Sequence, residues 1–172
     1  MSVVVRLAGA ADAAWLAALA ERTFRETYTE FNTPENMERY VADHFGPDLQ
    51  AAELRDSGKV TLVVEVDGAA AGYAQLARGP APPSIGGPDP MELVRFYVDR
   101  PWHGRGLAQR LMAATADTAR AAGARTLWLG VWERNGRAIA FYRKCGFEDV
   151  GTHTFVLGDD HQRDRVLVRR LH

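Results

Sequence analysis

The sequence predicts a single α+β domain over residues 1–172, with a mixed, mostly antiparallel sheet of six or seven strands and helices on both of its faces. Segments of strand length that are rich in β-branched residues alternate with longer segments whose apolar residues recur at helical spacing. Asp67-Gly68 is a hairpin turn between two of these strands, which makes them antiparallel. No linker between two domains is evident.

The first part of the chain is expected to form one strand and then three helices. The valine-rich segment Val3–Leu7 predicts a strand, and Asp12 is a suitable N-cap for the helix that follows it. Thr33 and Pro34 combine a capping residue with proline at the first helical position, which predicts a second helix. A short third helix is expected over residues 48–55.

The rest of the chain alternates strands and helices. Strands over 59–66 and 69–78 form the predicted hairpin, and the segment 79–90, with five prolines and three glycines, is expected to be a surface loop. That loop is either a plain connection or a lid over a bound acceptor. A polar turn over 158–161 is expected to join the last two strands. The other elements are a strand, a helix, a strand, a helix and those two strands, over 91–98, 107–122, 125–132, 135–144, 148–157 and 165–171.

Composition and charge narrow the class of protein. Lys and Arg number 21 and Asp and Glu number 22, so the chain as a whole is not expected to bind nucleic acid by electrostatic attraction. Its apolar runs are too short to span a membrane, and its first residues lack the features of a signal peptide. One cysteine, Cys145, favours a reducing compartment, and a cytoplasmic enzyme is therefore expected. The five histidines show no metal-ligand spacing, so no metal site is expected.

The segment His103-Gly104-Arg105-Gly106-Leu107-Ala108 connects a predicted strand to a predicted helix. Two glycines allow the backbone to turn tightly and to approach a ligand. The first N–H groups of a helix lack acceptors within the helix, and with the helix dipole they favour an anion such as a phosphate group. The alternative is a plain turn before a helix. A dinucleotide-binding loop does not fit the position after an antiparallel hairpin, and a P-loop would need Gly-Lys-Ser or Gly-Lys-Thr.

Charge is unevenly distributed along the chain. Residues 100–144 contain nine Lys or Arg and two Asp or Glu, a net charge of +7. Residues 21–56 contain four Lys or Arg and nine Asp or Glu, a net charge of −5. An ordinary solvated surface mixes the two signs more evenly, so the asymmetry indicates a basic ligand face and a separate acidic face.

Two motifs resemble those of the GNAT superfamily of acyl-CoA N-acyltransferases. The pyrophosphate loop of that family is Gln/Arg-x-x-Gly-x-Gly/Ala, and residues 103–108 match it except that His103 stands where Gln or Arg is usual. Residues 135–147 resemble the family's Asn-x-x-Ala-x-x-x-Tyr-x-x-x-Gly-Phe helix. Together with the strand before the loop, the resemblance spans residues 92–147. The N-terminal half resembles, more loosely, bacterial acetyltransferases of the spermidine/spermine type.

The resemblance implies an enzyme that moves an acetyl group from acetyl-CoA to a primary amine by direct attack. Tyr142 would protonate the leaving thiolate, Glu92 would be the base, and the Val98 amide would bind the thioester oxygen. Strand alternation is expected to place Glu92 on the same face as Phe96 and Val98. The residues that would contact acetyl-CoA are Phe96, Tyr97, Val98, His103, Gly104, Arg105, Gly106, Leu107, Ala108, Asn135, Arg137 and Tyr142.

The acceptor and the partners are less constrained. A small cationic amine is favoured because the acidic segment contains a run of glutamates, namely Glu26, Glu30, Glu35 and Glu38. The same residues are equally typical of solvent-exposed helix faces. A catalytically degenerate acyl-CoA sensor or partner-binding module is the alternative to an enzyme. Neither a nucleic-acid nor a membrane partner is expected, and a homodimer is one option for the oligomeric state.

Overall fold

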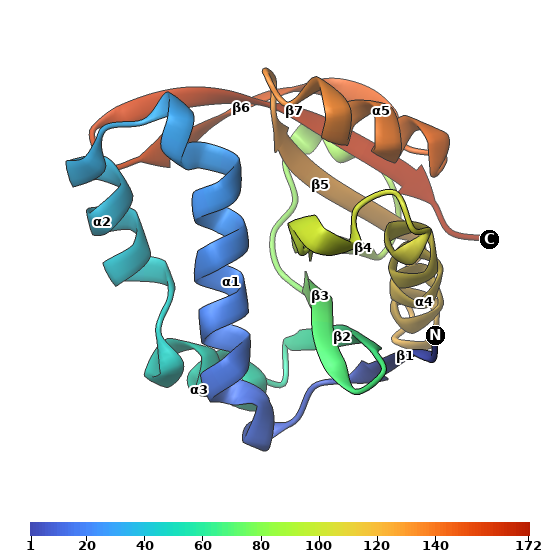
Figure 1. Cartoon of the computed structure of the whole chain (residues 1–172). Coiled ribbons are helices and arrows are strands. Elements are labelled where there is room, and N and C mark those ends of the chain that lie inside the picture. The colour runs from blue at the N-terminus through green and yellow to red at the C-terminus, as the bar shows by residue number, and fades with distance from the viewer.

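The computed structural model describes residues 1–172, apart from the side chain of Phe155. Its strands form one seven-stranded sheet in the order β1-β2-β3-β4-β5-β7-β6 (Figure 1). Neighbouring strands are antiparallel except for β4 and β5, which are parallel. The strands are β1 (Val3–Leu7), β2 (Lys59–Val66), β3 (Ala69–Ala77), β4 (Pro90–Val98), β5 (Thr126–Trp132), β6 (Glu148–Leu157) and β7 (Asp160–Arg170). The predicted α+β architecture is confirmed.

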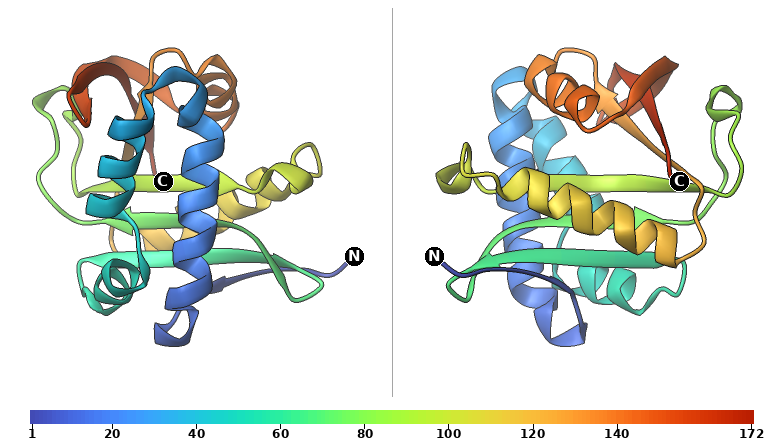
Figure 2. Two further views of the ribbon diagram at one scale, coloured as in Figure 1. Left: turned by 60° about the vertical axis from the view of Figure 1, so that its left-hand side comes forward. Right: turned by 90° about the vertical axis from the view of Figure 1, so that its right-hand side faces the viewer.

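Helices cover both faces of this sheet, as Figure 2 shows. Apolar residues of α1 and α2 pack with Tyr73 of β3 on one face, and Leu54 of α3 joins them. Residues of α4 and α5 form the larger core with β2, β3, β4 and β5 on the other face. The helices are α1 (Ala13–Tyr28), α2 (Pro34–His44), α3 (Pro47–Arg55), α4 (Leu107–Ala121) and α5 (Gly136–Lys144).

The last hairpin differs from the prediction. β7 begins at Asp160, whereas the sequence predicted a polar turn over 158–161. The turn is only two residues long, because Leu157 already pairs with Asp160. Polar residues continue into the strand, and two of them, Gln162 and Asp164, are buried. Polarity therefore did not mark the end of the turn, since residues that face inward from this strand are themselves polar.

The proline-rich loop 79–90 packs on the sheet as a connection between β3 and β4. It contains a short 3-10 helix over Pro83–Ile85, and Ile85 is 3% exposed. The Ile85 side chain packs in a small cluster with Trp128 of β5 and Val166 of β7. The loop is thus held against the sheet by a buried side chain, as expected of a plain connection.

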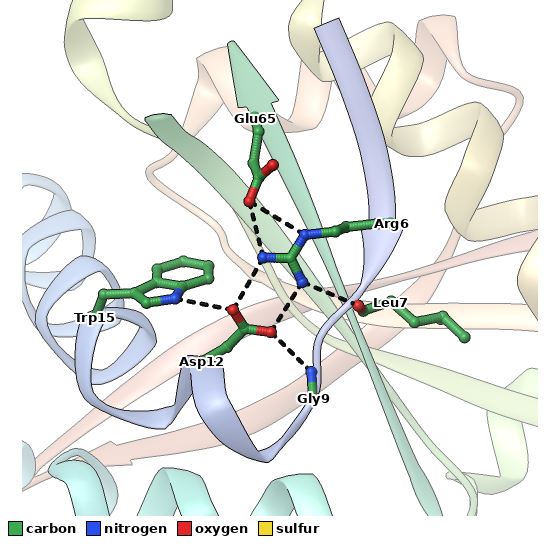
Figure 3. Close-up of polar contacts among 6 residues, drawn as sticks. All are labelled: Arg6, Leu7, Gly9, Asp12, Trp15 and Glu65. Atoms are coloured by element: carbon green, nitrogen blue, oxygen red, sulfur yellow. Dashed lines mark hydrogen bonds and ion pairs between the residues drawn. The ribbon is translucent and has the colours of Figure 1, made fainter. Parts of the chain in front are cut away.

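A charged cluster joins β1, β2 and the start of α1 (Figure 3). The Arg6 guanidinium donates to both carboxylate oxygens of Asp12 at 2.9 Å and to Glu65 at 2.8 Å. Asp12 also accepts hydrogen bonds from the Gly9 backbone N–H and the Trp15 indole N–H. The hydrogen bonds from Arg6 hold the pKa of Asp12 well below its usual range. Asp12 is the N-cap residue of α1, as predicted, but its side chain makes no capping hydrogen bond to that helix. It binds Arg6 of β1 and Trp15 of α1 instead.

Replacing Asp12 with alanine should destabilise the fold by about 2 kcal/mol, because Arg6, Trp15 and Gly9 all lose an acceptor. In thermal unfolding this corresponds to a Tm lowered by about 4–8 °C for a chain of this size. Because the pKa of Asp12 is depressed in the folded state, the difference should be complete above about pH 4 and should shrink as the pH falls further.

Asp117→Ala is the matched control for this measurement. Asp117 pairs with Arg120 at 2.9 Å on the surface, and its side chain is 78% exposed. Its loss should change the free energy of unfolding by less than about 0.5 kcal/mol. Equal effects of the two substitutions would show that the cluster adds no special stability.

Candidate active site

β4 and β5 pair only at their starts and then separate. The ladder between them ends at Glu92 and Trp128. A β-bulge bends β4 just beyond this point, because Leu76 pairs with Leu93 and the next rung joins Gln75 to Arg95. Val94 is therefore an extra residue in β4. The result is an opening between two parallel strands in the middle of the sheet.

A cleft of about 610 Å³ occupies this opening. It is bounded by β4, β5, the starts of α4 and α5, and the end of α1 with the turn that follows. Arg105 alone among the predicted acetyl-CoA residues lies outside it, with its guanidinium 5.3 Å from the ring centroid of Trp102. The predicted residues that line the cleft are Phe96, Tyr97, Val98, His103, Gly104, Gly106, Leu107, Ala108, Asn135, Arg137 and Tyr142.

The loop between β4 and α4 has the backbone geometry of an anion site. Gly104 and Gly106 have φ values of +76° and +78°, a region that favours glycine. Gly106 is also the N-cap of α4, so the first unpaired N–H groups of this helix begin at the cleft. Arg100, Arg134 and Arg137 line the same cleft and add positive charge. The basic face predicted from the sequence therefore borders the loop.

The His103 ring joins this loop to the end of β4. Its Nε2 atom lies 2.6 Å from the carbonyl oxygen of Val98, so this nitrogen donates the hydrogen bond. The N–H of Asp99 donates to the Ala71 carbonyl on β3 at 2.7 Å. Since successive backbone groups of a strand point to opposite sides, the Val98 N–H points away from β3 and toward the opening. His103 thus fixes the backbone at the residue whose amide faces the cleft.

α5 places Tyr142 in the wall of the cleft. Asn135 begins this helix, because its side-chain oxygen accepts the Ala138 N–H at 3.2 Å. Tyr142 is 8% exposed, and burial raises the pKa of its hydroxyl above the ordinary value. The phenol therefore stays protonated at neutral pH and can serve as a proton donor. Its ring lies among three other aromatic rings, those of Phe96, Phe141 and Phe147.

Glu92 does not line the cleft. The extra residue Val94 reverses the alternation of side chains along β4, so Glu92 lies on the face opposite to Phe96 and Val98. Glu92 also pairs with Trp128, at the last rung before the strands separate. Burial raises the pKa of its carboxyl, as the sequence suggested, but the group is in the wrong place to act on a ligand in the opening. The prediction of a shared face was wrong because it assumed an unbroken strand.

The other end of the cleft is aromatic, which the two motifs did not predict. Trp132 ends β5, and its ring centroid lies 5.8 Å from that of Tyr28 and 4.9 Å from that of Phe31. All three residues line the cleft, and Phe31 is 51% exposed. Tyr28 and Phe31 belong to the end of α1 and the turn after it. This end of the cleft therefore depends on contacts between segments about 100 residues apart in the sequence.

The acidic segment contributes little to the cleft. Glu26 lines it, whereas Glu30 and Glu35 are exposed. Glu38 is 70% exposed and pairs with Arg25 at 2.9 Å. Most of these glutamates therefore lie on solvated helix faces, and Glu26 is the one placed to meet an acceptor.

The described residues contain no group of three or more His, Cys, Asp or Glu side chains arranged to hold a metal ion. Cys145 is a free thiol, and burial raises its pKa, which disfavours the nucleophilic thiolate. No described helix is long and apolar enough to cross a membrane.

The sequence also matches the model of a known protein family. Residues 19–147 match the model described as the Acetyltransferase (GNAT) family. The chain belongs to this family. It is therefore an acetyl-CoA-dependent acyltransferase, and the alternative of a degenerate sensor is set aside.

Relatives of this GNAT enzyme match it over nearly its whole length. It is 38% identical over 160 residues to an uncharacterized N-acetyltransferase of Mycobacterium bovis, covering 93% of this chain and 98% of the relative. It is 33% identical over 154 residues to an uncharacterized N-acetyltransferase of Lactobacillus delbrueckii subsp. lactis, covering 90% and 89%.

Solved GNAT structures share its fold. The PaiA N-acetyltransferase of Thermoplasma acidophilum in complex with coenzyme A aligns with a TM-score of 0.80 at 18% identity, covering 99% of both chains. YncA of Salmonella typhimurium, a putative acetyltransferase with its cofactor acetyl-CoA, aligns with a TM-score of 0.71 at 20% identity, covering 100% of this chain and 95% of that one.

The loop assignment in this GNAT enzyme can be tested at Gly106. Gly106→Asp introduces a carboxylate where a pyrophosphate would approach, and acetyl-CoA should bind at least about tenfold more weakly in calorimetric titration. Gly106→Asn is the matched control, because asparagine tolerates positive φ and adds no charge. If the two variants bound acetyl-CoA equally well, the pyrophosphate would lie elsewhere.

Proposed function

We propose that this enzyme transfers the acetyl group of acetyl-CoA to a primary amine by direct attack of the amine nitrogen on the thioester carbon. One observation carries the proposal: the opening between β4 and β5 joins a basic glycine loop to a second, aromatic end. Loop 103–108 would bind the pyrophosphate, the end of β4 would bind the pantetheine, and the acceptor would enter from the aromatic end.

Two groups of the cleft would assist the transfer, the Val98 N–H and the Tyr142 hydroxyl. As the nitrogen bonds to the carbonyl carbon, negative charge develops on the oxygen, and the Val98 N–H would stabilise it. The carbon–sulfur bond breaks, and the Tyr142 hydroxyl would protonate the thiolate. Burial keeps this proton on Tyr142 at neutral pH, so the hydroxyl is available when the thiolate forms beside it.

A small cationic amine is the acceptor that we propose. Glu26 and the rings of Tyr28, Phe31 and Trp132 support it, because carboxylates and aromatic faces both attract ammonium ions. The other glutamates are exposed to solvent outside the cleft, so a preference for cationic acceptors would depend on the residues that line the cleft. The enzyme would act in the cytoplasm, as its single free cysteine suits a reducing compartment.

Tyr142→Phe removes only the hydroxyl of the proposed acid. Turnover of an amine acceptor should fall by about 10²- to 10⁴-fold, while the affinity for acetyl-CoA changes little. Thiol release measured with acetyl-CoA and an amine gives the first quantity, and calorimetric titration gives the second. Tyr73→Phe is the control, since Tyr73 lies outside the cleft and its substitution should leave turnover unchanged. Unaltered turnover in Tyr142→Phe would assign the proton to water.

Acceptor preference can be measured with a panel of amines. Diamines and polyamines should show a higher kcat/KM than neutral or acidic amines, and added salt should reduce their advantage. Glu26→Gln should lower kcat/KM for the cationic acceptors by about 2- to 5-fold, as expected for a partly exposed charge pair. Glu30→Gln should have no such effect. A preference for an acidic amino acid would refute the proposed acceptor class.

A further inference from the structure

The carboxyl of Asp164 has no role in the fold that explains its burial. Asp164 lies on β7 with its side chain 9% exposed, and its Oδ1 atom has no hydrogen-bond partner among the described residues. Burial raises the pKa of this carboxyl to about 7, and the nearby charge of Glu133 acts in the same direction. An unpaired buried acid lowers stability, and such groups are typical of functional sites.

The position of Asp164 links this acid to the acceptor end of the cleft. Asp164 pairs with Trp132 across β5 and β7, and Gly130 lies on the same face two residues earlier on β5. Both Trp132 and Gly130 line the cleft. A Cβ atom on Gly130 would lie 3.0 Å from Asp164 Oδ2 and 3.0 Å from His153 Nε2. Asp164 and His153 do not line the cleft themselves; they lie directly behind Gly130, whose lack of a side chain leaves room for both groups against the cleft wall.

Two further polar groups surround the carboxyl. His153 pairs with Asp164 across β6 and β7, and its Nε2 lies 3.7 Å from Oδ2, which is longer than a hydrogen bond. The His153 side chain is 35% exposed and so connects the carboxyl to solvent. Gln162 lies two residues before Asp164 on the same face, and its Oε1 is also buried without a partner among the described residues. Two acceptor oxygens on this face of β7 are thus buried without a donor among the described residues.

The same cleft connects this region to the proposed acid. Tyr28, Trp132 and Tyr142 all line it, and the ring centroids of Tyr28 and Trp132 lie 5.8 Å apart. Trp132 in turn pairs with Asp164 across β5 and β7. An acceptor at the aromatic end therefore lies in the same cleft as the Tyr142 hydroxyl and next to the strand residue that pairs with Asp164.

We propose that Asp164 binds the reacting ammonium group of the acceptor and takes the proton that the amine must lose before it attacks. This inference rests on the proposed function, and it assigns to Asp164 the role of base that the family resemblance implied for Glu92. The ammonium group donates to Oδ2, the oxygen that lies against Gly130 at the cleft wall, and the nitrogen bonds to the thioester carbon once that proton is gone. The nitrogen loses two protons in all. One reaches solvent through Asp164 and His153. The other returns to the Tyr142 phenolate after that group has protonated the thiolate.

The groups that face Asp164 limit what can titrate with it. They come from five neighbouring segments: His153 on β6, Glu133 after β5, Tyr28 on α1, Tyr40 on α2 and Tyr97 on β4. Burial raises the pKa of all three tyrosines, so they stay neutral between pH 6 and 8. A pH dependence in that range therefore reports on Asp164 or on its charged neighbours, which variants can separate.

Asp164→Asn keeps the shape of the side chain and removes the proton acceptor. kcat/KM for the amine should fall by about 10²- to 10⁴-fold, whereas acetyl-CoA should raise the Tm as it does in the wild type. In the wild type, kcat/KM should rise with pH and level off above about 7, because the carboxyl must be deprotonated to act. In the variant, kcat/KM should keep rising with pH, because only amine that is already neutral can react.

Two controls complete the experiment. His153→Asn should keep the plateau with a smaller loss of activity; a plateau lost in His153→Asn and kept in Asp164→Asn would overturn the proposal. Asp164→Ser is a second variant, in case Asp164→Asn does not fold. If neither variant binds acetyl-CoA, the pH dependence of the wild type decides: a kcat/KM that is constant between pH 6 and 8 would contradict the proposal. A wild type that acetylates no amine refutes the proposed function and this inference with it. An active wild type matched by an equally active Asp164→Asn refutes the inference alone.

Discussion

Backbone N–H and C=O groups in the middle of a sheet need partners, and β4 and β5 stop providing them to each other beyond Glu92 and Trp128. The bulge at Val94 fixes where this happens, because it bends β4 away while β3 still pairs with it on the other side. The exposed edge of β4 then offers the Val98 amide to a ligand. The glycine loop, α5 and the aromatic turn after α1 are all arranged around this one interruption, and the site depends on it.

The cofactor side could be predicted from the sequence because its signals are local. Gly104 and Gly106 adopt positive φ within a few residues of the helix that they precede, and Asn135 caps the helix that carries Tyr142. Each of these features depends on neighbours along the chain, which a motif captures. The face predicted for the Glu92 side chain was wrong for the opposite reason. That face depends on a bulge set by the pairing of β4 with β3, and no residue type within β4 indicates the bulge.

The acceptor side could not be predicted in the same way. The aromatic residues at this end come from α1, the turn after it and β5, and they meet only when the sheet is assembled. The polar start of β7 suggested a turn, although Gln162 and Asp164 are buried there. The net charge of residues 21–56 also did not show which glutamates line the cleft. Glu38 pairs with Arg25 on the surface, and of the four glutamates named above only Glu26 lines the cleft.

The two ends of the cleft must hold opposite charges without cancelling each other. Arg95 lines the cleft and would repel a cationic acceptor, but Glu53 on α3 binds its guanidinium at 2.8 Å and the ring of Phe45 lies 4.9 Å from it. The ion pair with Glu53 neutralises the charge of Arg95, so the unpaired positive charge of the cleft comes from the basic residues around the glycine loop. An anionic cofactor and a cationic amine can then occupy one opening together. Under the proposal made for Asp164, an ammonium group would compensate this buried carboxyl, so acceptor binding would be coupled to the charge that the fold leaves unpaired.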